Sequence, residues 1–277
     1  MPNAIDPQAV SASQGELTST EKYTTERITW MHRWAPTLFS FRLSRAAAYQ
    51  FTPGQFARLG VRKEDGQFAW RAYSLCSASG ADHLEFFSVV VPQGEFTSRL
   101  CAYDVGATVL VEKKAQGFLT ADRFYRDAGR KDLWMLATGT GLGPYLSILQ
   151  DPQTWRQFEN LILVHSVRHA NELAYAEMLE ALKEHPPFAN AQAKFHYVPT
   201  VTRENAPGAL QQGRITALIE GGKLENAAGV TFSHDWSRFM LCGNPEMVEQ
   251  TRKLLKDRGF KNDRKLEPGH IAVENYW

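Results

Sequence analysis

The sequence predicts a two-domain protein in which an antiparallel β-barrel is followed by an α/β domain with a parallel sheet. The chain has 277 residues, which is comfortable for two hydrophobic cores. Before about residue 125, short strand-like runs follow one another, whereas after Lys131 apolar runs alternate with helical segments. We therefore expect domains at residues 21–125 and 126–277, preceded by a disordered tail at residues 1–20.

Composition and charge exclude several classes of protein. The tail is polar and lacks a basic start or an apolar stretch, so we do not expect a secretory signal. No run of 18 apolar residues is present, and we expect no membrane helix. The formal net charge of +1 gives no indication of a nucleic-acid partner. Cys76, Cys101 and Cys242 are far apart, which excludes a disulfide framework and a four-cysteine metal site within this chain. We expect a reduced, cytoplasmic, monomeric protein without a metal.

The first domain is predicted to be a small closed barrel. Phe39, Phe41 and Leu43 alternate with polar residues, which is typical of a half-buried strand. The remaining elements are expected as a turn at residues 51–55, strands at 84–91 and 105–112, and a helix that begins near Phe96.

The second domain is predicted to hold a parallel sheet covered on both faces, because strands and helices alternate along the chain. Ligands of such sheets bind beyond the carboxyl ends of the strands. Strands are expected at 133–138, 161–167, 195–201 and 239–243, with helices ending at 149, over 171–183, after Arg214, and over 245–258.

The segment Gly139-Thr140-Gly141-Leu142-Gly143-Pro144 separates a predicted buried strand from a helix. Glycines at such a turn let a dinucleotide approach the backbone, and the start of the helix favours phosphate. The third glycine comes one residue earlier than in the usual GxGxxG pattern. A purely structural turn is an equally good interpretation of this segment alone.

Two segments of the barrel carry groups that suit a flat ring and a phosphate. Arg71 can offer a planar fork to a pyrophosphate, Tyr73 can stack on an aromatic ring, and Ser74 can hydrogen-bond a ring nitrogen. The second segment, residues 94–99 (GEFTSR), could hold a phosphate through backbone N–H groups and hydroxyls. The alternatives are ordinary surface and core positions for the first segment and an ordinary helix cap for the second.

Two further segments lie near the end of the chain. Residues 242–245 (CGNP) follow the last apolar strand, and a packed strand end before a helix is the alternative to a binding role. The final residues Val273-Glu274-Asn275-Tyr276-Trp277 are unusually aromatic for a terminus. They indicate docking against a flat group, or else burial in the protein's own core.

Taken together and in this order, RAYS, GEFTSRL, GTGLGPYLSIL, the TRE of residues 202–204, CGNPEMV and VENYW resemble the ferredoxin/flavodoxin–NADP⁺ reductase family, in its bacterial subclass that ends in an aromatic residue. The resemblance runs from about residue 22 to the end. It implies a barrel that binds FAD, a second domain that binds NADP(H), and ferredoxin or flavodoxin as the electron-carrier partner.

The resemblance also implies roles for single residues. In the barrel, FAD would be held by Arg71, Ala72, Tyr73 and Ser74, by Phe87, Ser88 and Val89 along the flavin, and by Glu95, Phe96 and Thr97 at the pyrophosphate. Thr140 would approach the flavin from the second domain, and Tyr276 and Trp277 would close the site. Val167, Arg168, Thr202, Arg203 and Arg214 would hold NADPH, the arginines at its 2′-phosphate. Arg214 matches least well, because the loop before it is one residue longer than the family pattern.

Chemistry follows from those cofactors: NADPH would give a hydride to the flavin, which would pass on single electrons. Ser74 would hydrogen-bond near flavin N5, and Cys242 and Glu274 would flank the nicotinamide without covalent catalysis. NAD-preferring sites place an acid near the ribose 2′-hydroxyl, and none directly follows the strand 161–167. The sequence therefore predicts a preference for NADPH.

Other functions remain to be weighed against this one. A basic run over residues 252–265, with Lys113 and Lys114, could steer an acidic carrier, or could be an ordinary solvated face. The reductase subunit of an oxygenase is a rival, but the cysteine spacing of its iron–sulfur domain is absent. A flavin-binding redox sensor is another rival, and it would need no arginines for a 2′-phosphate.

Overall fold

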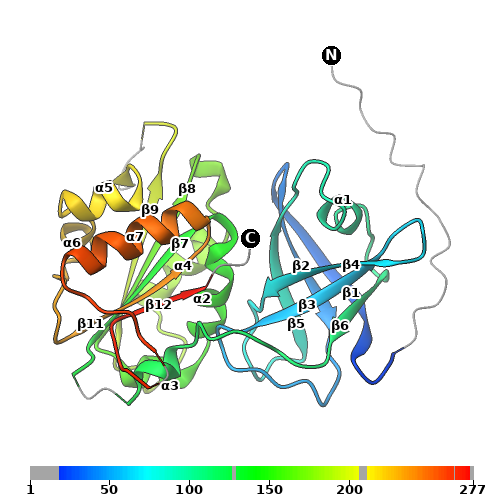
Figure 1. The fold of residues 1–277 in the computed structure, drawn as a ribbon, viewed down its shortest axis with the longest axis horizontal. Coiled ribbons are helices and arrows are strands. Elements are labelled where there is room, and N and C mark those ends of the chain that lie inside the picture. Colours follow the sequence, from blue (N-terminus) through cyan, green and yellow to red (C-terminus); the bar gives the residue numbers. More distant parts are fainter. Residues whose placement is uncertain (1–18, 127–128, 206–210, 265, 275–277) are drawn as a thin grey trace.

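The computed structural model describes residues 19–126, 129–205, 211–264 and 266–274. The residues of the expected tail up to position 18, Lys265, Tyr276 and Trp277 lie outside the described residues. Figure 1 shows two domains side by side, with the chain passing from one to the other between β6 and β7. Within the described part of the chain, no helix is long and apolar enough to cross a membrane.

The first domain is an antiparallel six-stranded sheet that closes on itself. Its strand order is β4-β3-β6-β1-β2-β5. Just beyond β4, Leu75 bridges Phe86 of β5, and the Cys76 N–H donates to the Glu85 carbonyl at 2.8 Å, so the two outer strands meet. The predicted barrel is thereby confirmed. Its elements are β1 Tyr23–Ala35, β2 Leu38–Ser44, β3 Phe56–Arg62, β4 Phe68–Ser74, β5 His83–Val89, α1 Thr97–Leu100 and β6 Thr108–Glu112.

Strand β2 is buried on both faces at Ser40, and not only on the face toward the barrel core. Phe39, Phe41 and Leu43 fill the barrel core, as their alternation predicts. Ser40, on the opposite face, is also fully buried, because that face packs against Tyr175 of the second domain. The prediction that this strand is half-buried is therefore wrong at Ser40. The segment from Arg71 to Ser74 forms the end of β4.

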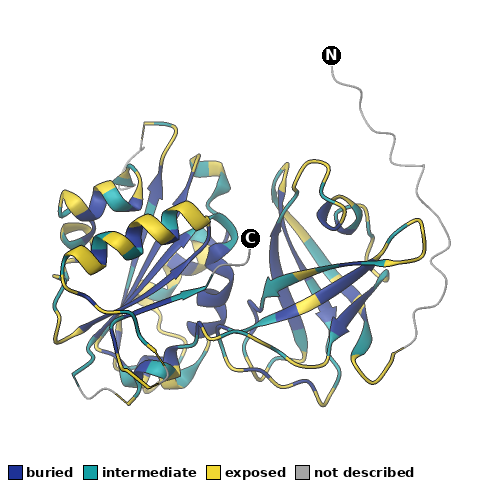
Figure 2. Ribbon diagram, viewed as in Figure 1, coloured by how far each residue is buried: buried dark blue, intermediate teal, exposed yellow. Residues whose placement is uncertain are grey.

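The second domain is a parallel sheet with helices on both faces, as predicted. Its strand order is β10-β9-β8-β7-β11-β12. Alternate residues of the strands face two separate cores: one contains side chains of α2, α3 and α4, and the other contains side chains of α5, α6 and α7. The strands are accordingly buried between the helices in Figure 2. The strands are β7 Asp132–Thr138, β8 Asn160–Val167, β9 Lys194–Val201, β10 Gln211–Gln212, β11 Ser237–Cys242 and β12 Ile271–Glu274.

One helix of this domain begins later than the sequence predicts. The helix expected over 171–183 is a 3₁₀ turn followed, after a break, by α4. The break occurs because Tyr175 adopts a left-handed backbone conformation with φ of 60°. The described helices are η1 Ala121–Phe124, η2 Gly139–Leu142, α2 Gly143–Ile148, α3 Pro152–Gln157, η3 Ala170–Glu172, α4 Ala176–Glu184, α5 Ile215–Glu220, α6 Lys223–Ala228 and α7 Pro245–Asp257.

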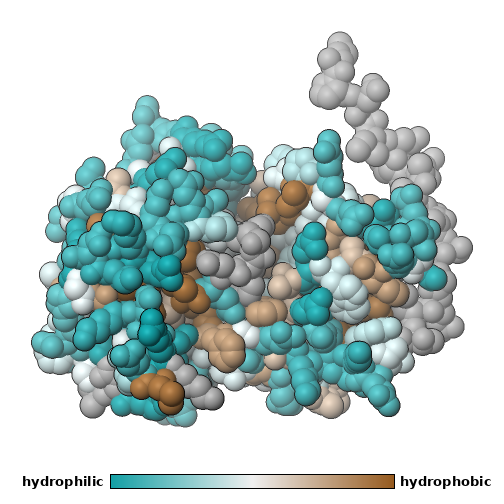
Figure 3. Space-filling model, in the orientation of Figure 1, coloured by the Kyte–Doolittle hydropathy of each residue, from teal (hydrophilic) through white to brown (hydrophobic). Residues whose placement is uncertain are grey.

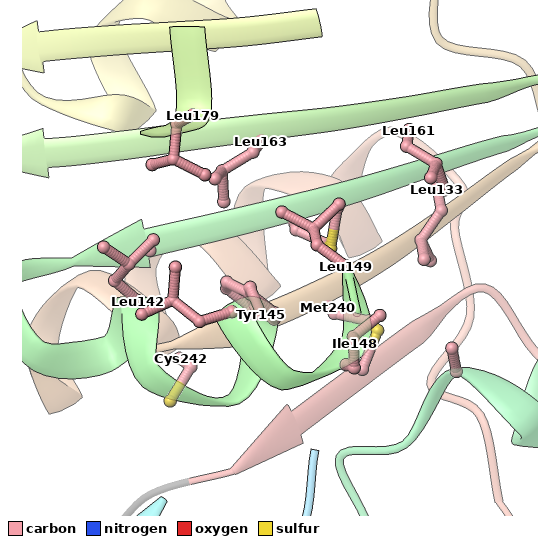
Figure 4. Packing of buried hydrophobic residues seen from close by; sticks show 14 of the residues in the cluster. Leu133, Leu142, Tyr145, Ile148, Leu149, Leu161, Leu163, Leu179, Met240 and Cys242 are labelled. Carbon is pink, nitrogen blue, oxygen red and sulfur yellow. The ribbon is translucent and has the colours of Figure 1, made fainter. Parts of the chain in front are cut away.

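One of these three hydrophobic cores contains side chains from both domains. The cluster around α2 includes Leu38, Cys76 and Phe87 from the barrel, and Figure 4 shows side chains of α2 meeting those of the strands above it. Hydrogen bonds cross the same boundary: Ser147 Oγ donates to the Ser77 carbonyl at 2.7 Å, and Gln150 Nε2 donates to the Cys76 carbonyl at 2.8 Å. These hydrogen bonds therefore fix the barrel against the carboxyl end of α2 and the residues that follow it.

Candidate functional site

A groove of about 800 Å³ opens at the carboxyl ends of the parallel strands and reaches the edge of the barrel. This is the edge where parallel sheets bind ligands. The groove gathers residues from the ends of β7, β8, β9 and β11 and from the barrel strand β5. Of the residues predicted to bind a cofactor, those that line it are Val89, Thr140, Val167, Arg168, Thr202, Arg203 and Arg214.

The three positions of the segment 139–144 that carry glycine do so for different structural reasons. A Cβ on Gly141 would lie 2.4 Å from the carbonyl oxygen of Cys242, and one on Gly143 would lie 3.2 Å from Cβ of Ser74. These two glycines therefore allow close packing against β11 and against the barrel. Gly139, with φ of 53°, has no atom within 4 Å of an added Cβ. Since Gly139 lines the groove, its backbone is open to a ligand.

Two arginine-bearing loops are joined at the wall of the groove. The N–H of Arg203 donates to the carbonyl of Arg168 at 2.9 Å, and Thr202 Oγ1 donates to the carbonyl of Val167 at 3.2 Å. Arg214 precedes α5 and lines the same groove. Three guanidinium groups around one groove suit a dianion such as a phosphate monoester.

An acidic residue also lines this wall, contrary to the expectation of an acid-free turn. Glu172 Oε1 accepts from Arg168 Nη2 at 2.8 Å, and Oε2 accepts from the backbone N–H groups of Arg168 and His169 at 2.9 and 3.3 Å. Burial alone would raise the pKa of the Glu172 carboxyl, but the hydrogen bonds from Arg168 and His169 outweigh it and lower that pKa. The 3₁₀ turn brings this carboxylate back to the end of β8, which spacing along the chain did not reveal.

In the barrel, Tyr73 and Ser88 are joined, and Ser74 meets the second domain. Tyr73 Oη and Ser88 Oγ are 2.9 Å apart, and burial raises the pKa of Tyr73 to about 12. Ser74 lies against Gly143 at the start of α2. Arg71 is exposed, with Nη1 donating to the carbonyl of Trp70 at 2.8 Å. Arg71, Tyr73 and Ser74 lie on β4, which leads to the domain boundary, and Ser88 lies on β5. Together these groups suit a ligand with a flat ring and a phosphate.

The residues around α1 adjoin the Tyr73 segment, because the rings of Phe96 and Tyr73 lie 5.4 Å apart. Phe96 is 1% exposed and belongs to the barrel core. Thr97 Oγ1 accepts from the N–H of Val91 at 2.9 Å, and Ser98 Oγ donates to the carbonyl of Gly94 at 2.5 Å. Glu95 is exposed. Phe87 packs edge-on to Tyr175 in the shared core, so Phe87 and Phe96 can offer a ligand only their backbone.

Cys242 and Glu274 are neighbours on β11 and β12. The two residues pair in the parallel ladder, and Glu274 Oε1 accepts from the N–H of Phe118 at 3.3 Å. Burial, followed by the Glu274 carboxylate, raises the pKa of the Cys242 thiol. Because a thiol is a poor nucleophile until it ionises, the geometry favours a packing and positioning role for Cys242.

A barrel and a groove-bearing parallel-sheet domain that share a core define a two-domain nucleotide-dependent oxidoreductase. Residues 135–253 match the family model of the oxidoreductase NAD-binding domain. The ferredoxin–NADP reductase of Pseudomonas aeruginosa is 41% identical over 90% of this chain and 96% of its own, and the flavodoxin/ferredoxin–NADP reductase of Escherichia coli is 40% identical over 92% and 99%. The chain belongs to the ferredoxin/flavodoxin–NADP reductase family.

A solved structure agrees with this assignment. A ferredoxin NADP⁺ reductase from Neisseria gonorrhoeae, crystallised with bound FAD and NADP, matches with a TM-score of 0.86 and 40% identity, covering 93% of this chain and all of that one. The likeness spans both domains, and it supports the predicted pairing of a barrel with a nucleotide-binding domain.

Proposed function

We propose that this protein is an FAD-dependent reductase that exchanges electrons between NADPH and ferredoxin or flavodoxin. The observation that carries the proposal is the arginine-lined groove at the carboxyl edge of the sheet, which reaches the barrel at Val89. Bound in the barrel, FAD would supply the chemistry that links a two-electron hydride donor to a one-electron carrier. The names of the relatives supply the class of carrier.

The barrel residues fit FAD through the chemistry of their donors. Arg71 is exposed and planar, which suits a pyrophosphate, and the joined side chains of Tyr73 and Ser88 offer an aromatic face beside a hydroxyl. Ala72 and Ser74 continue this wall to the domain boundary. Phe87, Val89, Glu95, Phe96 and Thr97 would add backbone contacts, and Tyr276 and Trp277 would close the site from outside the barrel.

The second domain would bind NADPH in the groove. Thr140 lies on the glycine turn, where an open backbone accepts a close ligand. Val167 and Thr202 fix the two loops, and Arg168, Arg203 and Arg214 would hold the 2′-phosphate. The flavin-facing roles fall to Ser74, as a hydrogen-bond donor, and to Cys242 and Glu274, which would shape the nicotinamide end without forming a bond to it.

The carrier is proposed to dock near Lys113 and Lys114, both exposed. The other basic run is partly neutralised. Its members form ion pairs as Arg252–Glu249, Lys253–Asp257, Arg258–Glu225 and Arg264–Glu267. Figure 3 shows a mainly hydrophilic surface over α6 and α7, which is typical of a solvated face. We propose a cytoplasmic monomer, in line with its free cysteines.

The test is whether the purified protein binds FAD and turns over. It should be yellow, and denaturation should release FAD. NADPH oxidation should proceed with ferricyanide as acceptor and with ferredoxin or flavodoxin. Release of FMN, or a colourless protein that cannot be reconstituted, would contradict the proposal. Turnover with the carrier protein should fall as the salt concentration rises, because screening shortens the range of attraction between surface charges to about 8 Å at physiological ionic strength.

Charge reversal separates the two basic surfaces. K113E/K114E should raise the KM for the carrier and leave ferricyanide turnover unchanged, because the small acceptor needs no docked protein. K261E should have a smaller effect on the carrier. Equal effects of both variants on ferricyanide would indicate damage to the cofactor site instead.

A further inference from the structure

The arginine wall of the groove contains an internal carboxylate. Glu172 lines the groove together with Arg168 and Arg203, and its Oε1 is 2.8 Å from Arg168 Nη2. The Glu172 side chain is 20% exposed, so it is part of the wall and still reaches the open space of the groove.

This carboxylate is fixed in place by the backbone. Its Oε2 accepts from the N–H groups of Arg168 and His169, and Glu204 holds the same turn from the neighbouring loop by accepting from the N–H of Ala170 at 2.5 Å. Because three donors bind Glu172, movement away from a ligand would break several hydrogen bonds. The negative charge therefore stays beside Arg168 when a nucleotide enters.

A fixed carboxylate acts in opposite ways on the two nicotinamide cofactors. The 2′-phosphate of NADPH, if held by Arg168, competes with Glu172 for the guanidinium group and lies close to the negative charge of that carboxylate. The free 2′-hydroxyl of NADH, by contrast, can donate a hydrogen bond to a carboxylate. NAD-preferring sites recognise the ribose in this way.

We propose that Glu172 is a specificity-determining residue that narrows the preference for NADPH over NADH. The inference rests on the proposed function of the groove as the nicotinamide-nucleotide site. Arg168, Arg203 and Arg214 supply the preference for the phosphate, and Glu172 limits it by opposing the phosphate and by accepting from the hydroxyl.

The test compares E172Q with the wild-type holoenzyme. The glutamine keeps an oxygen that can accept from the backbone but has no charge. With ferricyanide as acceptor, the ratio of kcat/KM for NADPH to that for NADH should rise about tenfold, since a hydrogen bond to a charged group is lost for NADH and a repulsion is relieved for NADPH. As competitive inhibitors, 2′,5′-ADP should bind more tightly to E172Q than to wild type, whereas 5′-AMP should bind no more tightly.

Glu246 provides the matched control, because its carboxylate lines the same groove at the start of α7 but accepts from Gln250 Nε2 at 2.9 Å and not from Arg168. E246Q should change both cofactors alike and leave the ratio within about twofold. E172A provides a second way to remove the charge, and thermal unfolding of each variant checks the fold. An unchanged or lower ratio in E172Q and E172A would overturn the inference. Wild-type protein that oxidises neither nucleotide would instead overturn the proposed function.

Discussion

We expect binding of the 2′-phosphate of NADPH to depend on Arg203 and Arg168. Replacing Arg203 by Ala should raise the KM for NADPH about tenfold to a hundredfold, because a hydrogen bond to a charged group contributes roughly 1.5–3 kcal/mol. NADH kinetics should barely change, since NADH lacks the 2′-phosphate. Steady-state assays with ferricyanide measure both cofactors, and R168A should behave similarly, with R214A weaker. Equal losses for both cofactors would indicate that the arginine only supports the loops.

His165 predicts a pH dependence of stability. Burial lowers the pKa of this fully buried side chain from 6.5 to about 4, and its Nε2 lies 3.2 Å from the Gly139 carbonyl. Between these two values the unfolded chain binds a proton that the folded protein does not. Stability should therefore fall as pH drops from about 6.5 to about 4, by about 1.4 kcal/mol per pH unit from this residue.

Urea unfolding of H165Q and wild type at several pH values checks this contribution. Glutamine can still donate to Gly139 but does not titrate. In the variant, the slope of the free energy of unfolding against pH should therefore be smaller by the contribution of about one proton. H185Q, at an exposed position, controls for the replacement of a histidine. Parallel pH profiles for wild type and H165Q would show that His165 does not titrate as inferred.

Single residues also show how much of the candidate site can be predicted from the sequence. Arg168 and Arg203 were foreseen in the groove because each follows a strand whose end lies on the binding edge. Glu172 was not foreseen, since its place depends on a 3₁₀ turn that folds four residues back onto the end of β8. Burial of Ser40 was missed for a similar reason: strand alternation describes one domain and does not reveal a second domain packed on the outer face.

At the scale of elements, the turn between β7 and α2 is held by glycine for steric reasons. Gly141→Ala should destabilise the protein by about 1–3 kcal/mol, because the added Cβ would lie 2.4 Å from the backbone oxygen of Cys242. Thermal unfolding measures the loss. Gly80→Ala is the control, because nothing lies within 4 Å of its added Cβ. Similar midpoints for the two variants would mean that the turn can relax.

Apolar runs and their periods predicted the central strands and α7, whereas local breaks escaped prediction. The helix expected from residue 171 begins at Ala176, because Tyr175 turns its ring toward the barrel and takes a left-handed backbone. The short edge strand β12 pairs with β11 over four residues, and such a run is too brief to show a period. These elements depend on tertiary contacts and not on local preference.

At the scale of the whole molecule, Tyr175 joins the two domains. Its Oη lies 2.5 Å from Ser40 Oγ and donates to Glu85 Oε1 at 2.8 Å, and Arg42 pairs with Glu85 at 2.7 Å. Tyr175→Phe should destabilise the protein by about 1–3 kcal/mol, because buried partners lose a hydrogen bond. Urea unfolding measures the change.

Tyr197 gives the matched control for this prediction. Its buried hydroxyl has no hydrogen-bond partner in the described part of the chain, so Tyr197→Phe should be neutral or slightly stabilising. Equal destabilisation by both variants would mean that loss of the hydroxyl acts through packing and not through the link between domains.

The core shared by the two domains restricts how such proteins can diversify. Leu38, Cys76 and Phe87 of the barrel pack with α2, and Gly143 leaves room for Ser74. A barrel taken from a distant homologue would bring side chains that do not complement this α2, so a hybrid would begin with voids or clashes along the seam. Recombination between lineages should therefore succeed where both sides of the seam are inherited together, and the two halves should carry correlated substitutions.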